Sequence, residues 1–392
     1  MKIDAVDFFY LSLPTVRDIG DGSQDALLVR VRAGDSVGWG ECEAAPLVCV
    51  ASWNCPMSHS ACKPLSASIL GQSLEDPADI ERINALVRAQ SFDLLQTDHT
   101  LSGIDIALWD LLARRRAQPV WQLLGYERAY PRVAYASLLF GDDAAATYQH
   151  ACAVAQAGYQ AVKFGWGPYG HGSIEADAAQ VQAAREGLGS EGLLLIDAGT
   201  VWGDDVAAAV ARLPALEANR VVWLEEPFVS GALDAYQECA RQCRTVKIAG
   251  GEGCHTFHQA KSMVDYAGVG FIQIDAGRIG GITTARAVAR YAAGRGVRYV
   301  NHTFTTPLAL SASLQPYAGS EADTLCEYPF EPSALARDFT RTKIIPDRQG
   351  CVRVPDGPGL GVEPDLDALQ KYFVPVEIKV GGTTVFSSTA LL

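Results

Sequence analysis

The middle of the chain alternates short apolar runs with alanine-rich helical stretches. Eight runs follow one another after Pro131: RVAYAS, QAVKFG, LLLIDAG, RVVWLEEP, TVKIAGGEG, GFIQIDAG, VRYVNHTF and DTLCEYP. Short apolar runs bounded by glycine or proline are typical of buried strands, and strands that alternate with helices predict parallel βαβ units. Eight units in about 200 residues match the size of a (β/α)8 barrel better than an open sheet. We therefore predict an α/β protein with a (β/α)8-type barrel over residues 129–330.

The two ends of the chain carry a different pattern. Near the N-terminus, KIDAVDFFYLSL and ALLVRVRAGDSVGWGEC alternate like antiparallel strands, and PADIERINALVRAQ and LSGIDIALWDLLARRRA then follow a helical period. The last residues, EIKVGGTTVFSSTALL, predict a hairpin. We expect an α+β capping domain in residues 1–128. Residues 331–392 are expected to complete the barrel and return to the capping domain.

Composition narrows the classes of function. The net charge of -13 argues against a general nucleic-acid surface, which needs a basic stripe. No apolar run is long enough to span a membrane, and the N-terminus lacks the apolar core of a signal peptide. Ten scattered cysteines without a CxxC pair disfavour a zinc site or a disulfide framework. We therefore expect a cytoplasmic protein that binds neither nucleic acid nor membrane.

Six ionisable residues close successive apolar runs, about one βα unit apart. They are Asp197, Glu225, Glu252, Asp275, His302 and Glu327. Because the carboxyl ends of barrel strands meet on one face, these side chains would ring one opening. A single acid after a strand is more often the N-cap of the next helix. A whole ring of carboxylates would repel itself unless it held a cation, which favours a functional site.

The chemistry of these residues divides into two groups. Asp197, Glu225 and Glu252 are all oxygen donors, and they predict a ligand set for a hard divalent cation, for which we expect Mg²⁺. Asp275 and His302, one βα unit apart, fit a general base that is oriented by a carboxylate.

At these motifs the sequence resembles the enolase superfamily, in its mandelate racemase subgroup, over nearly the whole chain. GWGEC and SGIDIALWDLLARRRAQPVWQLLG resemble the strand of the capping domain and the helix that leads into the barrel. IDAG, WLEEP and GGEG resemble the three metal-ligand motifs, and IDAGRIGG and VNHTF those of the Asp–His dyad. LCEYP resembles the last strand. The resemblance implies removal of a proton next to a carboxylate, with Mg²⁺ stabilising the ene-diolate.

The resemblance also implies roles for two further residues. Lys163, in QAVKFG, is expected to be the cation that meets the substrate carboxylate rather than a surface charge at the end of a strand. Proton transfer by Lys163 is the alternative role. Glu327, if protonated among its acidic neighbours, would donate a hydrogen bond to the other carboxylate oxygen. The family further suggests a homo-oligomer, and cap loops that close over the barrel mouth and set the substrate's stereochemistry.

Two positions depart from the pattern of the family. Where mandelate racemases carry Lys-x-Lys, residues 163–165 are KFG, and where many relatives have Asp-Ala-Asn, residues 197–199 are DAG. The missing second lysine disfavours racemisation, which needs a base on each face. His302 alone can still serve dehydration, first as base and then as acid on the same face.

The two glycines, Gly165 and Gly199, are expected to widen the pocket for a polyhydroxylated chain. The loop WGPYGHG could contact such a chain, although an ordinary glycine-rich loop is the alternative. The candidate substrate contacts are Trp166, Tyr169 and His171 of this loop, together with Arg278 near the dyad.

The sequence therefore predicts a Mg²⁺-dependent dehydratase that acts on a small anionic sugar acid. An aldonate or aldarate would be converted into its 2-keto-3-deoxy product. Within enzymes, the alternatives are an epimerase, racemase or cycloisomerase on the same scaffold, and a Schiff-base aldolase that uses Lys163. A non-catalytic binder of sugar acids is the alternative from another class.

Overall fold

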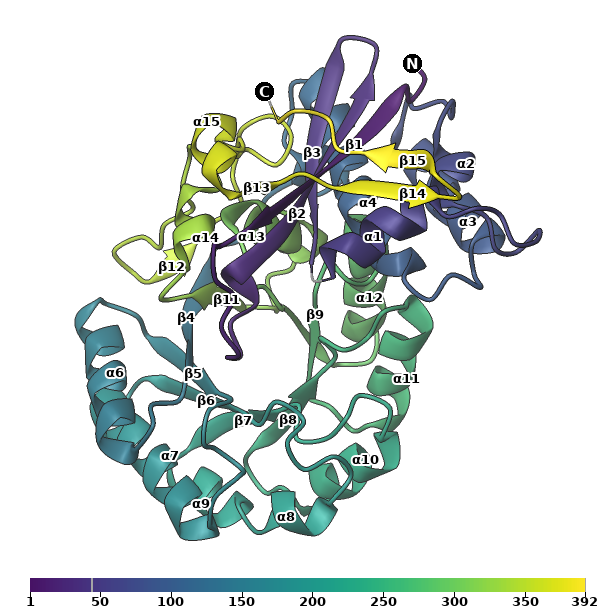
Figure 1. Cartoon of the computed structure of the whole chain (residues 1–392). Helices are drawn as coiled ribbons and strands as arrows, with labels where there is room; N and C mark the ends of the chain where they lie inside the picture. The colour runs from purple at the N-terminus through teal and green to yellow at the C-terminus, as the bar shows by residue number, and fades with distance from the viewer. Residues whose placement is uncertain (44, 392) are drawn as a thin grey trace.

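Eight parallel strands form the barrel predicted by the alternating pattern (Figure 1). The structure is a computed structural model and describes residues 1–43 and 45–391. The strands are β4 (Arg132–Leu139), β5 (Ala161–Gly165), β6 (Leu193–Asp197), β7 (Val221–Glu225), β8 (Lys247–Gly250), β9 (Phe271–Ile274), β10 (Arg298–Asn301) and β11 (Leu325–Pro329). Their spatial order is β10-β9-β8-β7-β6-β5-β4-β11, and the short β12 (Cys351–Val352) pairs with β4. Each of the eight apolar runs therefore supplies one barrel strand.

The barrel closes between β10 and β11 through a side chain. In the described part of the chain, no backbone ladder joins these two strands. Instead, Asn301 Oδ1 accepts a hydrogen bond from the Glu327 amide at 3.0 Å, and Asn301 Nδ2 donates to the Glu327 carbonyl at 3.3 Å. The hydroxyl of Tyr317 also donates to Asn301 Oδ1, at 2.9 Å. The Asn301 amide thus holds together the strand ends that carry His302 and Glu327.

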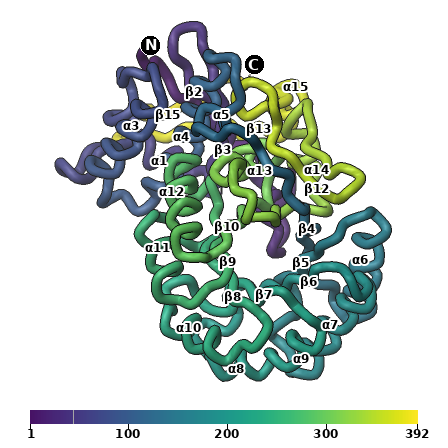
Figure 2. The backbone as a smooth tube through the Cα atoms, turned by 180° about the vertical axis from the view of Figure 1, so that it is seen from behind, coloured from purple at the N-terminus to yellow at the C-terminus, as the bar shows by residue number. Residues whose placement is uncertain are grey.

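Helices cover the outside of the barrel, as both views of the chain show (Figures 1 and 2). They are α6 (Ala144–Gln156), α7 (Ile174–Leu188), α8 (Val206–Val210), α9 (Leu213–Ala218), α10 (Leu233–Gln242), α11 (Phe257–Tyr266), α12 (Gly281–Ala293) and α13 (Pro307–Leu314). Local caps define where several of them begin. For example, Thr256 and Gln259 form a capping box at the start of α11, which satisfies amides that the helix itself cannot pair.

A second, antiparallel sheet forms the capping domain, with the strand order β13-β1-β2-β3. Its strands are β1 (Ala5–Ser12), β2 (Asp25–Ala33), β3 (Ser36–Cys42) and β13 (Phe373–Val374), and its helices are α1 (Pro46–Asn54), α2 (Leu65–Ile69), α3 (Pro77–Gln90), α4 (Thr97–Arg115) and α5 (Val120–Leu123). Because β13 pairs with β1, the chain returns to the capping domain after the barrel. The tail contains α14 (Ala334–Asp338), α15 (Leu366–Leu369) and the predicted hairpin, β14 (Glu377–Val380) with β15 (Thr383–Ser387).

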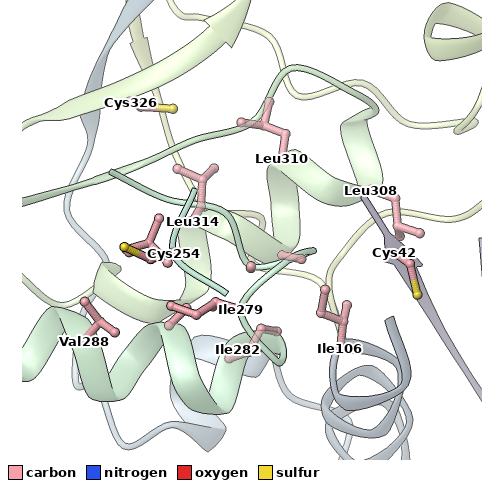
Figure 3. Packing of buried hydrophobic residues seen from close by; sticks show 14 of the residues in the cluster. Cys42, Ile106, Cys254, Ile279, Ile282, Val288, Leu308, Leu310, Leu314 and Cys326 are labelled. Carbon is pink, nitrogen blue, oxygen red and sulfur yellow. The ribbon is translucent and has the colours of Figure 1, made fainter. Parts of the chain in front are cut away.

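Close packing joins the capping domain to the barrel. Within the capping domain, a Cβ atom on Gly40, in the GWGEC motif, would overlap the carbonyl oxygen of Gly103. Glycine at this position therefore lets α4, the helix that faces the barrel, lie directly on β3. Buried Asp105 of α4 accepts a hydrogen bond from the Thr283 amide at the start of α12, at 3.0 Å. Figure 3 shows the apolar side of this contact, where Cys42 and Ile106 of the capping domain lie near Ile282 and Leu308 of barrel helices. The two parts therefore share one core.

No helix in the described part of the chain is both long enough and apolar enough to cross a membrane.

Candidate active site

Side chains on a strand alternate between its two faces, and this alternation places several ionisable side chains of the barrel strands at the barrel mouth. One buried apolar cluster takes one residue from each of seven strands: Tyr135, Ala161, Leu195, Trp223, Ala249, Val300 and Leu325. Side chains two positions apart on a strand share a face. Two positions beyond members of this cluster stand Ser137, Lys163, Asp197, Glu225, His302 and Glu327. The strand register therefore explains why these residues meet.

The three predicted metal ligands converge on one point. Asp197, Glu225 and Glu252 each offer one carboxylate oxygen, and these oxygens lie within 4.8 Å of one another. Burial raises the pKa of Asp197 to about 6 and that of Glu225 to about 8, and neighbouring carboxylates add to both increases, although Lys163 opposes them. Buried oxygen donors with incompletely compensated charge fit a hard divalent cation.

Lys163 lies inside this cluster of acids and is buried. Its Nζ atom is 2.5 Å from Glu225 Oε1, 2.8 Å from Glu327 Oε1 and 3.5 Å from Asp197 Oδ2. Burial alone would lower the pKa of Lys163, but the three carboxylates outweigh it and hold that pKa well above its ordinary value. The structure therefore excludes a surface charge and places a stable ammonium beside the metal ligands.

Asp275 and His302 form the predicted dyad. His302 Nδ1 lies 2.8 Å from Asp275 Oδ2, and the opposite ring nitrogen, Nε2, lies 3.2 Å from Glu252 Oε2. Burial would lower the pKa of His302, but Glu252 and Glu327 outweigh it and raise that pKa to about 10. Asp275 thus orients the imidazole so that Nε2 faces the metal-ligand side of the site.

Glu327 differs from the expectation of a protonated donor. Its Oε1 atom accepts hydrogen bonds from Ser137 Oγ at 2.9 Å and from Lys163, and Oε2 accepts one from the Thr303 amide at 2.7 Å. Burial raises the pKa of Glu327, but Lys163 and His302 outweigh it and hold that pKa below its usual range. In this arrangement the Glu327 carboxylate acts as an acceptor in all of these contacts, so the condition of the expectation, a protonated Glu327, is not met here.

Of the two glycines expected to widen the pocket, Gly165 lines the cavity and Gly199 does not. A Cβ atom on Gly165 would lie 2.8 Å from Asp197 Cβ and Oδ2, and one on Gly199 would lie 2.9 Å from the Trp166 ring. Gly199 also has a positive φ of 55°. A side chain at position 165 would therefore meet Asp197, and one at position 199 would meet the Trp166 indole.

A cavity of about 300 Å³ opens above these residues. Among the predicted substrate contacts, Trp166 and Arg278 line it. Tyr169 does not, because it is buried with its ring stacked on Phe140 at 4.9 Å. His171 is exposed and also lies outside the cavity lining. The structure therefore places Tyr169 and His171 outside the cavity, contrary to the expectation that they line it.

Three polar residues of the cavity lining were not predicted from the sequence. Ser137 stands in register with Lys163 at the end of the first barrel strand, so the strand-end rule could have found it. Asp21 and Glu43 come from connections of the capping domain, where no periodic pattern marks them. The guanidinium of Arg278 donates two hydrogen bonds to Glu43, one of them at 2.8 Å, and thereby joins the capping domain to the site.

Comparison with known proteins covers both parts of the chain. Residues 13–125 match the family model of the mandelate racemase / muconate lactonizing enzyme N-terminal domain, and residues 146–368 match the enolase C-terminal domain-like model. A D-galactarolactone cycloisomerase of Agrobacterium fabrum is 31% identical over 89% of this chain and 91% of its own length. A D-gluconate dehydratase of Thermoproteus tenax is 29% identical over 83% of this chain and 67% of its own length.

Solved structures agree with this assignment. A structure described as a predicted mandelate racemase from Rhodobacter sphaeroides is 56% identical, with a TM-score of 0.95 over 99% of each chain. A racemase from Streptomyces coelicolor A3(2) with bound magnesium is 25% identical, with a TM-score of 0.79 over 95% of this chain and all of that one. The protein is therefore a member of the enolase superfamily, in its mandelate racemase / muconate lactonizing enzyme subgroup.

Proposed function

We propose that the protein is a Mg²⁺-dependent dehydratase of sugar acids. The observation that carries this proposal is the one-sided placement of the base. His302 is oriented by Asp275 with Nε2 toward the metal ligands, whereas residue 165, where a second lysine would stand, is a glycine without room for a side chain. A site with its base on one face suits elimination better than racemisation, which needs a proton carrier on each face.

The residues of the site can divide the reaction between them. The acids around His302, Glu252 first among them, raise its pKa, and a cation held by Glu252 would offset that effect. The neutral imidazole would then remove the proton α to the substrate carboxylate, and Lys163 neutralises part of the charge on that carboxylate. Mg²⁺ held by Asp197, Glu225 and Glu252 would supply the positive charge that stabilises the second negative charge developing there. Protonated His302 then returns its proton to the hydroxyl that leaves the adjacent carbon. One water is lost, and the remaining enol becomes a 2-keto-3-deoxy acid.

Cycloisomerisation is the second candidate, and one observation favours it. The relative that is 31% identical is named a cycloisomerase rather than a dehydratase. The same base could act if the oxygen that leaves belongs to a ring, but the product would then keep the mass of the substrate. A Schiff-base aldolase is less well supported, because Lys163 is held as an ammonium by three carboxylates and cannot act as a neutral amine in that state.

A substrate panel tests this proposal. The purified protein with Mg²⁺ is incubated with aldonates, aldarates and their lactone and anhydro derivatives, and the products are scored for a 2-keto group and by mass. We expect a 2-keto acid that has lost one water. A product of unchanged mass would favour the cycloisomerase, and no turnover of any member would contradict the proposal.

A further inference from the structure

The cavity lies between a barrel wall and a cap wall. The barrel wall carries Lys163, His302 and acids of the metal cluster, and the cap wall is built from residues 19–22 of the connection between β1 and β2. Figures 1 and 2 show this connection, in purple, reaching from the capping domain over the barrel opening. A substrate whose carboxylate lies at the barrel wall therefore extends its other end toward the β1–β2 connection.

Hydrogen bonds within the connection and from the C-terminal segment stabilise the conformation of the cap wall. Gln24 Nε2 donates to the carbonyls of Arg17 at 2.9 Å and of Asp21 at 3.2 Å, while Gln24 Oε1 accepts from the Arg17 amide at 2.7 Å. From the C-terminal segment, Ser333 Oγ donates to the Ser23 carbonyl at 2.7 Å. Gln24 thus joins the two ends of the connection, and Ser333 of the C-terminal segment binds it from the other side.

The same connection packs against the barrel wall. A Cβ atom on Gly20 would lie 3.1 Å from the ring of Trp166, so the two surfaces are already in close contact. Trp166 has a positive φ of 56°, and its ring also fills the space beside Gly199. These contacts keep the cap wall close to the site.

Asp21 is the carboxylate residue of this wall. Its Oδ1 atom accepts hydrogen bonds from the Ser23 amide at 2.8 Å and from Ser23 Oγ at 2.6 Å, which makes Asp21 the N-cap of the short 3₁₀ helix Gly22–Gln24. An aspartate is negatively charged at neutral pH. Because the capping bonds fix Oδ1, the negative charge is held at a defined place in the cavity lining.

The cations that line the cavity are already paired. In the described residues of the lining, the lysines and arginines are Lys163 and Arg278. Lys163 contacts the carboxylates of the metal cluster, and Arg278 donates two hydrogen bonds to Glu43. Arg17 belongs to the same connection as Asp21 but is outside the lining. A second carboxylate on a substrate would therefore find Asp21, and no unpaired cation, at the cap wall.

We infer that the site selects sugar acids with a single carboxylate, such as aldonates or monoanionic lactones and anhydro acids, and rejects aldarates through Asp21. The inference rests on the proposed function, which places the reacting carboxylate at the barrel wall. A hydroxyl at the far end of the substrate can donate a hydrogen bond to the Asp21 carboxylate. A carboxylate there is repelled by it, and this repulsion is stronger in a cavity than in open water.

Matched pairs of substrates test the inference. D-galactonate with galactarate, D-gluconate with D-glucarate, and D-xylonate with xylarate differ within each pair in the group at the far end of the chain. The full-length protein with Mg²⁺ is assayed for kcat/KM, and binding of each compound is measured by calorimetry. We expect the wild type to prefer the monoacid of an accepted pair at least tenfold in both measurements.

The decisive variant is Asp21→Asn, which keeps an oxygen acceptor for the cap but removes the charge. We expect it to reduce the preference at least fivefold, chiefly by lowering KM for the diacid. Asp21→Ser, which also keeps a capping oxygen, should do the same. Asp18→Asn is the matched control, because Asp18 is exposed on the same connection and lies outside the cavity. It should leave the preference unchanged.

The outcomes separate this inference from the proposed reaction. Equal or better binding of the diacid by the wild type, or an unchanged preference in both Asp21 variants, would overturn the inference. Binding of monoacids over diacids without turnover of any compound would overturn the proposed reaction and support the charge preference. Binding of no member of any pair would overturn both.

Discussion

The barrel wall and the cap wall of the cavity differ in the local structure that positions their side chains. On the barrel wall, each functional side chain stands at the end of a strand, and the strand register fixes its direction. On the cap wall, Asp21 comes from a connection whose shape depends on particular hydrogen bonds. The barrel wall holds the groups for proton removal, and we infer that the cap wall selects the substrate. A change on one wall should therefore affect catalysis, and a change on the other should affect selectivity.

Removal of a metal ligand should have the largest effect. We expect Glu225→Gln to lower kcat/KM on the order of 10³-fold and to abolish measurable Mg²⁺ binding, because it removes one of three converging carboxylates. Calorimetry with Mg²⁺ and a substrate assay measure both effects. Glu238→Gln, at an exposed position of α10, is the control. A Glu225 variant that binds Mg²⁺ like the wild type would contradict the assigned ligand set.

The acid cluster should also make metal binding depend on pH. Because the pKa of Asp197 is raised to about 6 and that of Glu225 to about 8, protons compete with Mg²⁺ below these values. We expect affinity to rise as pH increases from about 6 to about 8, by up to about tenfold per pH unit for each proton displaced. Calorimetry in two buffers of different ionisation enthalpy would measure the proton release, and pH-independent affinity would contradict this account.

The same groups predict the pH dependence of stability without metal. Their raised pKa values mean that the folded chain holds protons which the unfolded chain has released. Stability should therefore fall as pH rises from about 4, to about 6 for Asp197 and to about 8 for Glu225. Thermal unfolding in EDTA should show a decreasing midpoint from about pH 5 to about pH 8, and Mg²⁺ should remove most of the decrease. A midpoint that rises over this range in EDTA would be inconsistent with the cluster.

Gly165 offers a smaller change on the barrel wall. Gly165→Ala places a methyl group against Asp197, its register partner on β6, and should displace that ligand. We expect Mg²⁺ affinity to fall about tenfold, with a stability cost of about 1–3 kcal/mol for the overpacked position. Gly172→Ala is the control, because its nearest new contact is an ordinary 3.6 Å. Unchanged metal affinity in Gly165→Ala would show that the glycine is not required by Asp197.

His171 should show the smallest effect of all. Because its side chain is exposed and outside the cavity, we expect His171→Ala to leave kcat/KM within about twofold of the wild type. Trp166→Ala, which removes a ring from the cavity lining, should lower kcat/KM more under the same assay. A large loss from His171→Ala would restore the original prediction that the WGPYGHG loop contacts substrate through this residue.

These contrasts explain how much the sequence could predict. The eight strands and the six strand-end residues follow from periodicity, because the side-chain direction on a strand depends only on position along that strand. The protonation of Glu327 could not be predicted, since it depends on Ser137 and Lys163 of neighbouring strands. The role of Gly165 was missed for the same reason, because Asp197 is its neighbour across the sheet and not along the chain.

The periodicity of apolar residues could not predict the residues of the cap wall. Nothing in PTVRDIGDGSQD indicates that Gln24 closes the connection or that Asp21 lines the cavity. Likewise, Tyr169 and His171 follow Trp166 closely in the sequence, yet only Trp166 reaches the cavity, because Tyr169 packs into the core. Contacts between residues far apart in the sequence determine which of these side chains reach the cavity.

The most direct test of the central claim, that His302 is the single base, is proton exchange in D₂O. The His302→Asn variant, loaded with Mg²⁺, is incubated with a substrate that the wild type converts, and NMR follows the hydrogen on the α-carbon. We predict that both exchange and elimination disappear, while the substrate still binds. Exchange that survives in this variant would contradict the claim and would show that a second group, with Lys163 the first candidate, removes the proton.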